Sequence, residues 1–403
     1  MNILERFLKY VSFDTKSDVN SKVKPSTEGQ MKLLKFLKEE MIDLGLKQID
    51  LDEENGILYA KIPSNINGNI TKIGFIAHVD TSPDTSGKNI NPKIKENYDG
   101  NDIYLNEERI LSQKEFHDLV EYKNKTLVVT DGTTLLGADD KAGIAEIMTM
   151  VEYVVNHPEI KHGEICIGFT SDEEISRGTE GFDIKRFGAD VAYTVDGGKI
   201  GEIAYENFNA KKAVVTIKGK SIHTGDAKDK MINASIVACE FNSKIPSEEI
   251  PSTTEGYEGF YHLDSITGEV EFAELKYNLR DFEEEGMQKR VDKINQIAEN
   301  LNNKYGKEIV NVEFFNQYEN MKTYLKNNMN LINDVISASD KIGISSFSIP
   351  IRGGTDGARL SKWGLPCPNL GTGGRNFHGI YEYVCVDDMK KISELLIELI
   401  KQK

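Results

Sequence analysis

The sequence predicts an α/β domain, built on a mixed, mostly parallel sheet flanked by helices, that is interrupted by an inserted α+β domain of ferredoxin-like character. In the first half, helical patterns alternate with short apolar runs, and polar or acidic residues follow each run at once. Near residue 210 the pattern changes to alternating, half-exposed strands, and helix–strand–helix character resumes later. We therefore expect one domain over residues 1–209 and 319–403, and a second over 210–318; the length of 403 residues allows both.

The elements of the first half follow from apolar spacing. Residues 3–11 and 31–44 repeat apolar side chains on one helical face, and Ser26 or Thr27 can cap the second helix, which Gly45 ends. Four apolar runs have the length and β-branched content of buried strands: residues 73–77, 126–130, 164–170 and 191–195. A helix that stops before Pro158 separates the second run from the third, as in a strand–helix–strand unit.

The inserted domain has a β-α-β-β-α-β-like order. Alternation predicts strands at 211–219, 268–280 and 309–315, and helical spacing predicts helices at 233–245 and 283–303. After this domain the chain returns to the first, and its last helix carries an apolar face through Ile392, Leu395, Leu396 and Leu399.

Composition excludes several classes of partner. The chain has 49 Lys and Arg against 65 Asp and Glu, a net charge of −16, which disfavours binding to nucleic acid or to an anionic membrane. No apolar run approaches the roughly 20 residues of a membrane span, and the N-terminal residues lack the features of a secretion signal. The four cysteines form no CxxC pair, so we expect a reduced, cytoplasmic protein.

Acidic residues and a histidine follow nearly every predicted strand of the first domain. They are His78 with Asp80, Asp139 with Asp140, the run Asp172, Glu173 and Glu174, and Asp196. Taken singly, each has an ordinary structural explanation: a core histidine, a helix cap, a solvated loop or a turn. Ligands in open parallel sheets, however, bind outside the carboxyl ends of the strands, so these groups are expected to converge. Carboxylates held that close repel one another, and a mixed imidazole and carboxylate set suits zinc and related divalent ions.

Further candidates occur in the second half. His378 lies in the glycine-rich stretch 371–379, for which a phosphate-binding loop is the rival interpretation. Neither this stretch nor 351–357 has the GxxxxGK[ST] spacing of such a loop. In the inserted domain, His223 and Arg280 would, taken alone, be structural or surface groups.

Long segments of the chain resemble one family. HVDTSPDTSG, TDGTTLLGADDKAGIAEIM, DEEI, TVDGG, EGYEGFYHLDSITG, RDF, IRGGTDGARLSKWGLPCPNLGTGG and NFHG are similar to the peptidase T family of tripeptide aminopeptidases, within the di-zinc aminoacylase and carboxypeptidase clan. The resemblance covers essentially the whole chain. It implies a di-zinc exopeptidase domain interrupted by a lid domain that also forms a homodimer, with short peptides as substrates.

The resemblance also implies individual roles. His78 and Asp196 would hold one Zn²⁺, Glu174 and His378 a second, and Asp139 would bridge both; Co²⁺ or Mn²⁺ are possible substitutes. Asp80 would orient His78, and Glu173 would be the general base. His223 would reach across the dimer to the partner's site. Residues implied to contact the substrate are Arg280, Arg352 and Asn376.

The chain departs from the family pattern at Thr224, Asp226, Ser176 and Arg375, none of which is an implied ligand. These departures bear on lid geometry and substrate preference. Within the same chemistry, the metal set also suits a dipeptidase, a carboxypeptidase or an N-acyl amino acid deacylase. Outside it, the alternatives are a catalytically silent peptide-binding module and a nucleotide-binding enzyme.

Overall fold

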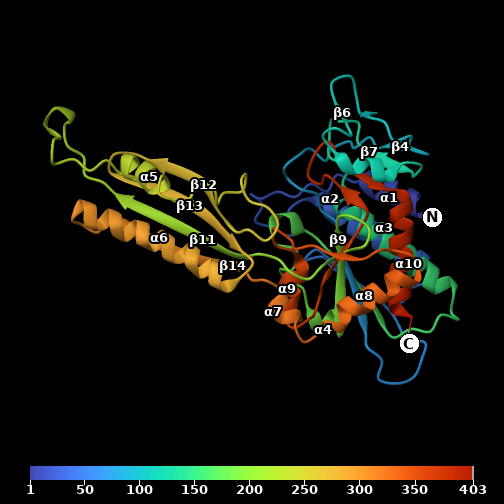
Figure 1. Ribbon diagram of the computed structural model, residues 1–403. Coiled ribbons are helices and arrows are strands. Elements are labelled where there is room, and N and C mark those ends of the chain that lie inside the picture. Colours follow the sequence, from blue (N-terminus) through green and yellow to red (C-terminus); the bar gives the residue numbers. More distant parts are fainter. Residues whose placement is uncertain (402–403) are drawn as a thin grey trace. The chain divides into compact units, whose positions relative to one another are not determined.

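The computed structural model describes residues 1–401. The chain folds into two compact units (Figure 1). Unit 1 contains Met1–Tyr205, Thr323–Ile349 and the chain from Thr355 onward, and unit 2 contains Glu206–Lys322 and Pro350–Gly354. The expected limits of the inserted domain, residues 210 and 318, lie inside unit 2. Within the described residues, no helix is both long enough and apolar enough to cross a membrane.

Unit 1 is built around an eight-stranded sheet that confirms the expected mixed, mostly parallel fold class. Its strands, in spatial order, are β1 (Gln48–Asp52), β2 (Ile57–Ile62), β8 (Ile165–Thr170), β3 (Ile73–His78), β9 (Val191–Gly197), β16 (Asn369–Gly371), β10 (Glu202–Ala204) and β15 (Phe347–Ser348). The four central strands β8, β3, β9 and β16 are parallel to one another. Their carboxyl ends therefore meet at the same edge of the sheet.

Helices cover this sheet with apolar faces. The helices of unit 1 are α1 (Ile3–Val11), α2 (Glu28–Asp43), α3 (Ala138–Asn156), α4 (Ile184–Phe187), α8 (Asn330–Lys341), α9 (Asp356–Lys362) and α10 (Val386–Ile400), and α7 (Lys322–Leu325) lies where the chain passes back into it. α3 packs directly on β9: a Cβ added to Gly143 would lie 1.9 Å from the carbonyl oxygen of Val195. Only glycine allows this approach, which sets α3 against the strand that ends near Asp196.

One predicted strand belongs to a different sheet. The run 126–130 forms β7 (Leu127–Val129), which pairs antiparallel with β4 (Lys93–Lys95) and β18 (Tyr383–Cys385) in a sheet completed by β17 (Gly374–Arg375). Leu127 and Val129 are buried in a small separate core with Tyr122 and Tyr383, beside the hairpin of β5 (Ile103–Tyr104) and β6 (Ile110–Leu111) and the 3-10 helix η1 (His117–Tyr122). An apolar run indicates that a strand is buried, but it does not indicate against which partner.

Unit 2 is a four-stranded antiparallel sheet with two helices. The strand order is β12 (Phe260–Gly268), β13 (Phe272–Asp281), β11 (Asn209–Lys218) and β14 (Val310–Tyr318), and the helices are α5 (Ala234–Asn242) and α6 (Glu284–Tyr305). The chain order β11-α5-β12-β13-α6-β14 is the expected β-α-β-β-α-β set. The apolar pattern did not locate β12, because this edge strand has mostly exposed or half-exposed side chains.

Candidate metal centre

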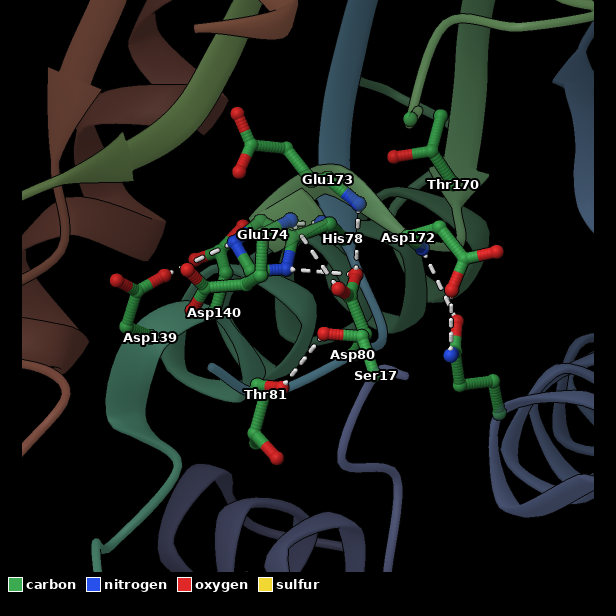
Figure 2. A network of polar contacts seen from close by, with 12 residues as sticks. Ser17, His78, Asp80, Thr81, Asp139, Asp140, Thr170, Asp172, Glu173 and Glu174 are labelled. Carbon is green, nitrogen blue, oxygen red and sulfur yellow. Dashed lines mark hydrogen bonds and ion pairs between the residues drawn. The ribbon is translucent and has the colours of Figure 1, made fainter. Parts of the chain in front are cut away.

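Imidazole and carboxylate groups from five segments of unit 1 meet at the carboxyl edge of its sheet. Figure 2 shows three of them, His78, Asp139 and Glu174. His78 is the last residue of β3, and Asp196 is the last but one residue of β9. Glu174 lies in the 3-10 helix η2 (Glu173–Ile175) that follows β8, and Asp139 lies at the start of α3. His378 comes from the segment between β17 and β18. The structure thus brings together all five residues for which a ligand role was expected.

Asp139 is shared between the two histidines. Its Oδ1 lies 2.9 Å from His78 Nε2, and its Oδ2 lies 3.3 Å from His378 Nε2. Each imidazole also has a carboxylate of its own: Asp196 Oδ1 is 3.3 Å from His78 Nε2, and Glu174 Oε2 is 2.9 Å from His378 Nε2. Two ligand atoms on one tetrahedral zinc ion, with bonds of 2.0–2.1 Å, are separated by about 3.3 Å. The observed separations therefore have the size expected for ligands that share an ion.

Asp140, the neighbour of Asp139, is engaged with the backbone instead. Its Oδ2 accepts the backbone N–H of His78 at 3.2 Å, and its Oδ1 accepts that of Gly143 at 3.3 Å. Asp140, His78 and Asp196 also form a second group of side chains that could hold a metal ion. Both oxygens of Asp140 already accept backbone amides. Asp139 is therefore the better placed of the two carboxylates to bridge two metal ions.

The buried carboxylates of the cluster favour the binding of a cation. Burial, opposed by His78 and reinforced by Asp139, raises the pKa of Asp196 to about 7, and burial with Asp139 raises the pKa of Glu174 to about 8. Hydrogen bonds to Asp139 and Glu174 raise the pKa of His378 to about 11. Protons held in this way are those that a bound divalent ion displaces. Glu174 Oε1 is buried without a hydrogen-bond partner among the described residues, so the site also offers a free ligand atom.

A second carboxylate lies behind each imidazole. Asp80, which is fully buried, has its Oδ1 3.3 Å from His78 Nδ1, as expected of a group that orients this histidine. Asp84 Oδ2 lies 3.3 Å from His378 Nδ1 in the same way. Sequence reasoning missed Asp84, although it lies in the segment HVDTSPD, because nothing in the local pattern shows which histidine it faces.

Asp80 also holds the acidic loop that follows β8. Its Oδ1 accepts the backbone N–H of Glu173 at 3.0 Å, as Figure 2 shows, and its Oδ2 accepts that of Glu174 at 3.1 Å. One buried side chain thus contacts both His78 and the loop with the expected base. The geometry of that loop relative to the histidine is therefore set by a single residue.

A further network, which sequence reasoning also missed, fixes the start of this loop. Asp172 has φ +63°, and its carboxylate accepts the backbone N–H of Ser26 at 2.8 Å, the Ser26 hydroxyl, and Gln30 Nε2 at 2.7 Å. Its own N–H donates to Gln30 Oε1 at 3.0 Å. Ser26 therefore does not cap α2; Thr27 is the N-cap residue, and its side chain makes no capping hydrogen bond within the described chain. Gln30 lies 142 positions from Asp172, so no local pattern could reveal the pair.

Glu173 lies beside the cluster without joining it. Figure 2 draws no contact to its carboxylate, whereas Glu174 is linked to the residues around it. Burial raises the pKa of Glu173 well above its usual value, and the charge of Asp356 adds to this effect. A carboxylate with raised proton affinity beside a metal centre has the properties of a general base.

The other expected site residues are not part of this cluster as the structure describes it. Asn376, in unit 1 with φ +56°, donates from Nδ2 to the Tyr381 carbonyl at 3.1 Å. His223 lies in unit 2, where its side chain is 82% exposed and Nδ1 accepts the N–H of Gly225. Arg280, also in unit 2, donates to Gln317 Oε1 at 2.9 Å. Their roles stay predictions.

Arg352, in unit 2, binds a loop of its own unit. Its Nη1 donates to the carbonyls of Gly256 and Glu258, each at 2.8 Å, and its Nη2 donates to the Thr254 hydroxyl at 2.8 Å. The guanidinium also stacks 5.1 Å from the Phe208 ring centre. The expected contact between Arg352 and substrate stays a prediction, but these bonds give the residue a structural function.

Two of the departures from the family pattern have visible partners. Ser176 has φ +60°, a left-handed conformation in which glycine is favoured, and its N–H donates to the Glu173 carbonyl at 2.7 Å. Arg375 forms an ion pair with Asp118, with Nε 2.6 Å from Oδ2. Both lie in unit 1, so these departures change how loops near the centre are held.

Comparisons with known proteins identify relatives of this chain. Residues 205–308 match the family model of the peptidase dimerisation domain M20_dimer. The chain is 55% identical to "Peptidase T" of Clostridium perfringens strain 13, over 98% of each chain, and 51% identical to "Peptidase T" of Clostridium acetobutylicum, over 99% of this chain and 98% of that one.

Solved structures share the fold over almost the whole chain. Aminopeptidase PepT from Bacillus cereus superposes with a TM-score of 0.77 at 24% identity, covering 99% of this chain and 97% of that one. The YXEP protein of Bacillus subtilis, a dinuclear metal-binding peptidase of the M20 family, superposes with a TM-score of 0.66 at 14% identity, covering 99% and 96%.

Proposed function

Because this chain belongs to the peptidase T family, we propose that it is a metal-dependent aminopeptidase that removes the N-terminal residue of tripeptides. The observation that carries the proposal is the placement of Asp139, whose two oxygens face two imidazoles that each have a further carboxylate. This placement favours two divalent cations that share Asp139. The donor set suits Zn²⁺, with Co²⁺ or Mn²⁺ as substitutes.

In the proposed assignment His78 and Asp196 would hold one cation, Glu174 and His378 would hold the other, and Asp139 would be a ligand of both. When bound, such a pair supplies a water of lowered pKa and polarises the peptide carbonyl. Glu173 accepts the proton of the attacking water on its carboxylate and donates it to the nitrogen of the departing dipeptide. Asp80 contributes by holding the Glu173 and Glu174 amides while it contacts His78.

Removal of metal combined with a peptide panel tests this function. We expect a chelator to abolish hydrolysis, and two equivalents of Zn²⁺ or Co²⁺ per chain to restore it, because the five ligands hold two ions. Tripeptides with a free N-terminus should release their first residue, and N-acetylated tripeptides should be inert. Products are identified by mass spectrometry. Release of the C-terminal residue would indicate a carboxypeptidase, cleavage of the acetylated peptides a deacylase, and preference for dipeptides a dipeptidase.

We further propose that the chain forms a homodimer through unit 2 and works in the cytoplasm. The match to a peptidase dimerisation domain over residues 205–308 supports the dimer. Within the described chain, all four cysteines are free, which is usual in a reducing compartment. His223, exposed on its turn, is proposed to reach the site of the partner subunit, where it would stabilise the developing oxyanion.

Mixed dimers test the role of His223. We expect His223→Ala and Glu173→Ala each to lose activity as homodimers, and their mixture to recover activity. Random exchange makes half of the dimers mixed, each with one complete site, so about a quarter of wild-type activity is expected. Activity is measured after subunit exchange, with unmixed variants as the control. If His223 served its own subunit, no site in a mixed dimer would be complete and no activity would return.

A further inference from the structure

The carboxylate of Glu382 accepts hydrogen bonds from three backbone amides of the loop that leads to Asp139. Its Oε2 accepts the N–H of Leu136 at 2.7 Å and of Gly137 at 3.0 Å, and its Oε1 accepts the N–H of Asp139 at 3.1 Å. The side chain is 1% exposed. Hydrogen bonds from amides to a buried carboxylate are short and strong compared with bonds between neutral groups. This one side chain therefore fixes both the entry to α3 and the backbone of Asp139 itself.

Glu382 belongs to the same segment as His378, and that segment is itself held in place. The Thr85 hydroxyl donates to the His378 carbonyl at 2.7 Å, and the Thr130 hydroxyl donates to the Ile380 carbonyl at 2.5 Å. Glu382, whose carboxylate binds the Asp139 loop, lies four positions after His378 in the chain. Glu382 thus joins the two loops whose ligand atoms, Asp139 Oδ2 and His378 Nε2, lie 3.3 Å apart.

We propose that Glu382 is a positioning residue that sets the separation between Asp139 and His378 and so determines how tightly the shared cation site binds. The inference rests on the proposed two-cation centre. All three amides of the Asp139 loop bind one carboxylate, and that carboxylate belongs to the segment that carries His378. An amide in its place would turn an N–H₂ group toward a backbone N–H and would move the Asp139 loop.

The variant Glu382→Gln keeps the size of the side chain and removes one acceptor oxygen. Glu146→Gln is the matched control, because Glu146 is also fully buried, and neither of its oxygens has a hydrogen-bond partner among residues 1–401. Metal-free samples of each are titrated with Zn²⁺ against a competing chelator. Changes in groups that orient metal ligands typically weaken binding by about 10- to 100-fold. We expect a loss of this size for at least one of the two ions in Glu382→Gln, and wild-type affinities in Glu146→Gln.

Two further measurements separate positioning from simple loss of stability. Urea unfolding of the metal-free proteins compares their free energies of unfolding. The visible absorption of Co²⁺-loaded samples reports the ligand geometry, which we expect to differ between Glu382→Gln and wild type. Glu382→Asp keeps the charge on a shorter chain and should recover part of the affinity; it carries the test if the glutamine variant does not fold.

The outcomes are distinct. If wild type binds two ions and the Glu382 variants bind both with unchanged affinity and an unchanged Co²⁺ spectrum, the positioning role is wrong, whatever the change in stability, and the proposed function stands. If wild type itself binds no pair of ions, the two-cation centre is wrong and this inference is wrong with it.

Discussion

Glu173→Gln is expected to lose nearly all turnover while both cations remain bound. The carboxylate of Glu173 lies outside the contacts that join Asp139, His78 and Glu174, so its replacement leaves the proposed ligands unchanged. Glutamine has similar size but cannot take a proton from water. Positioned general bases typically contribute about 10²- to 10⁴-fold to rate, and kcat should fall by a factor in this range.

The measurement combines kcat with elemental analysis of the purified variant. Glu180→Gln is a suitable control, because Glu180 belongs to the same loop region but has a side chain that is 56% exposed and pairs with Arg177. It should keep wild-type kcat. A Glu173→Gln protein that retained substantial activity with two bound ions would exclude Glu173 as the base.

Asp139→Asn is expected to have the larger effect on the metal itself. Each oxygen of Asp139 faces a different histidine, so loss of its charge weakens both proposed ion sites at once. We expect metal content to fall from two ions to one or fewer, and activity to fall below that of Glu173→Gln. Asp196→Asn, which alters a carboxylate beside only one histidine, should weaken one ion more than the other.

Asp140→Asn is the control that identifies the bridging residue. The oxygens of Asp140 accept the amides of His78 and Gly143, so its replacement should lower thermal stability but leave two ions bound under saturating Zn²⁺. Elemental analysis and thermal unfolding measure the two effects separately. The reverse pattern, with both ions lost from Asp140→Asn and retained in Asp139→Asn, would assign the bridge to Asp140.

The parts of the fold that sequence could predict are those with local causes. Helical spacing located α1 and α3, and buried apolar runs located β3, β8 and β9. His78 and Asp196 lie at the carboxyl ends of β3 and β9, and Glu174 follows β8 in η2. Topology alone then brings these side chains to one edge. The run that forms β7 shows the limit, since its partner strand β18 lies more than two hundred residues away in the chain and leaves no local signature.

The same limit applies within the site. His378 could be singled out as a candidate, but its role as a ligand rested on a family resemblance, because its segment is not part of the central sheet. Gln30 and Glu382 were not predicted at all. Each acts through hydrogen bonds to backbone groups of distant loops, and neither a residue type nor a spacing indicates such a bond.

The loop that carries Glu173 is bounded by two residues with left-handed backbones, Asp172 at φ +63° and Ser176 at φ +60°. The buried side chains of Asp80 and Gln30 accept hydrogen bonds from the backbone amides of Glu173 and Asp172. The entropy of ordering this loop is therefore spent once, when the protein folds, and does not recur with each substrate that enters. We accordingly expect this loop to keep one conformation before and after a substrate binds.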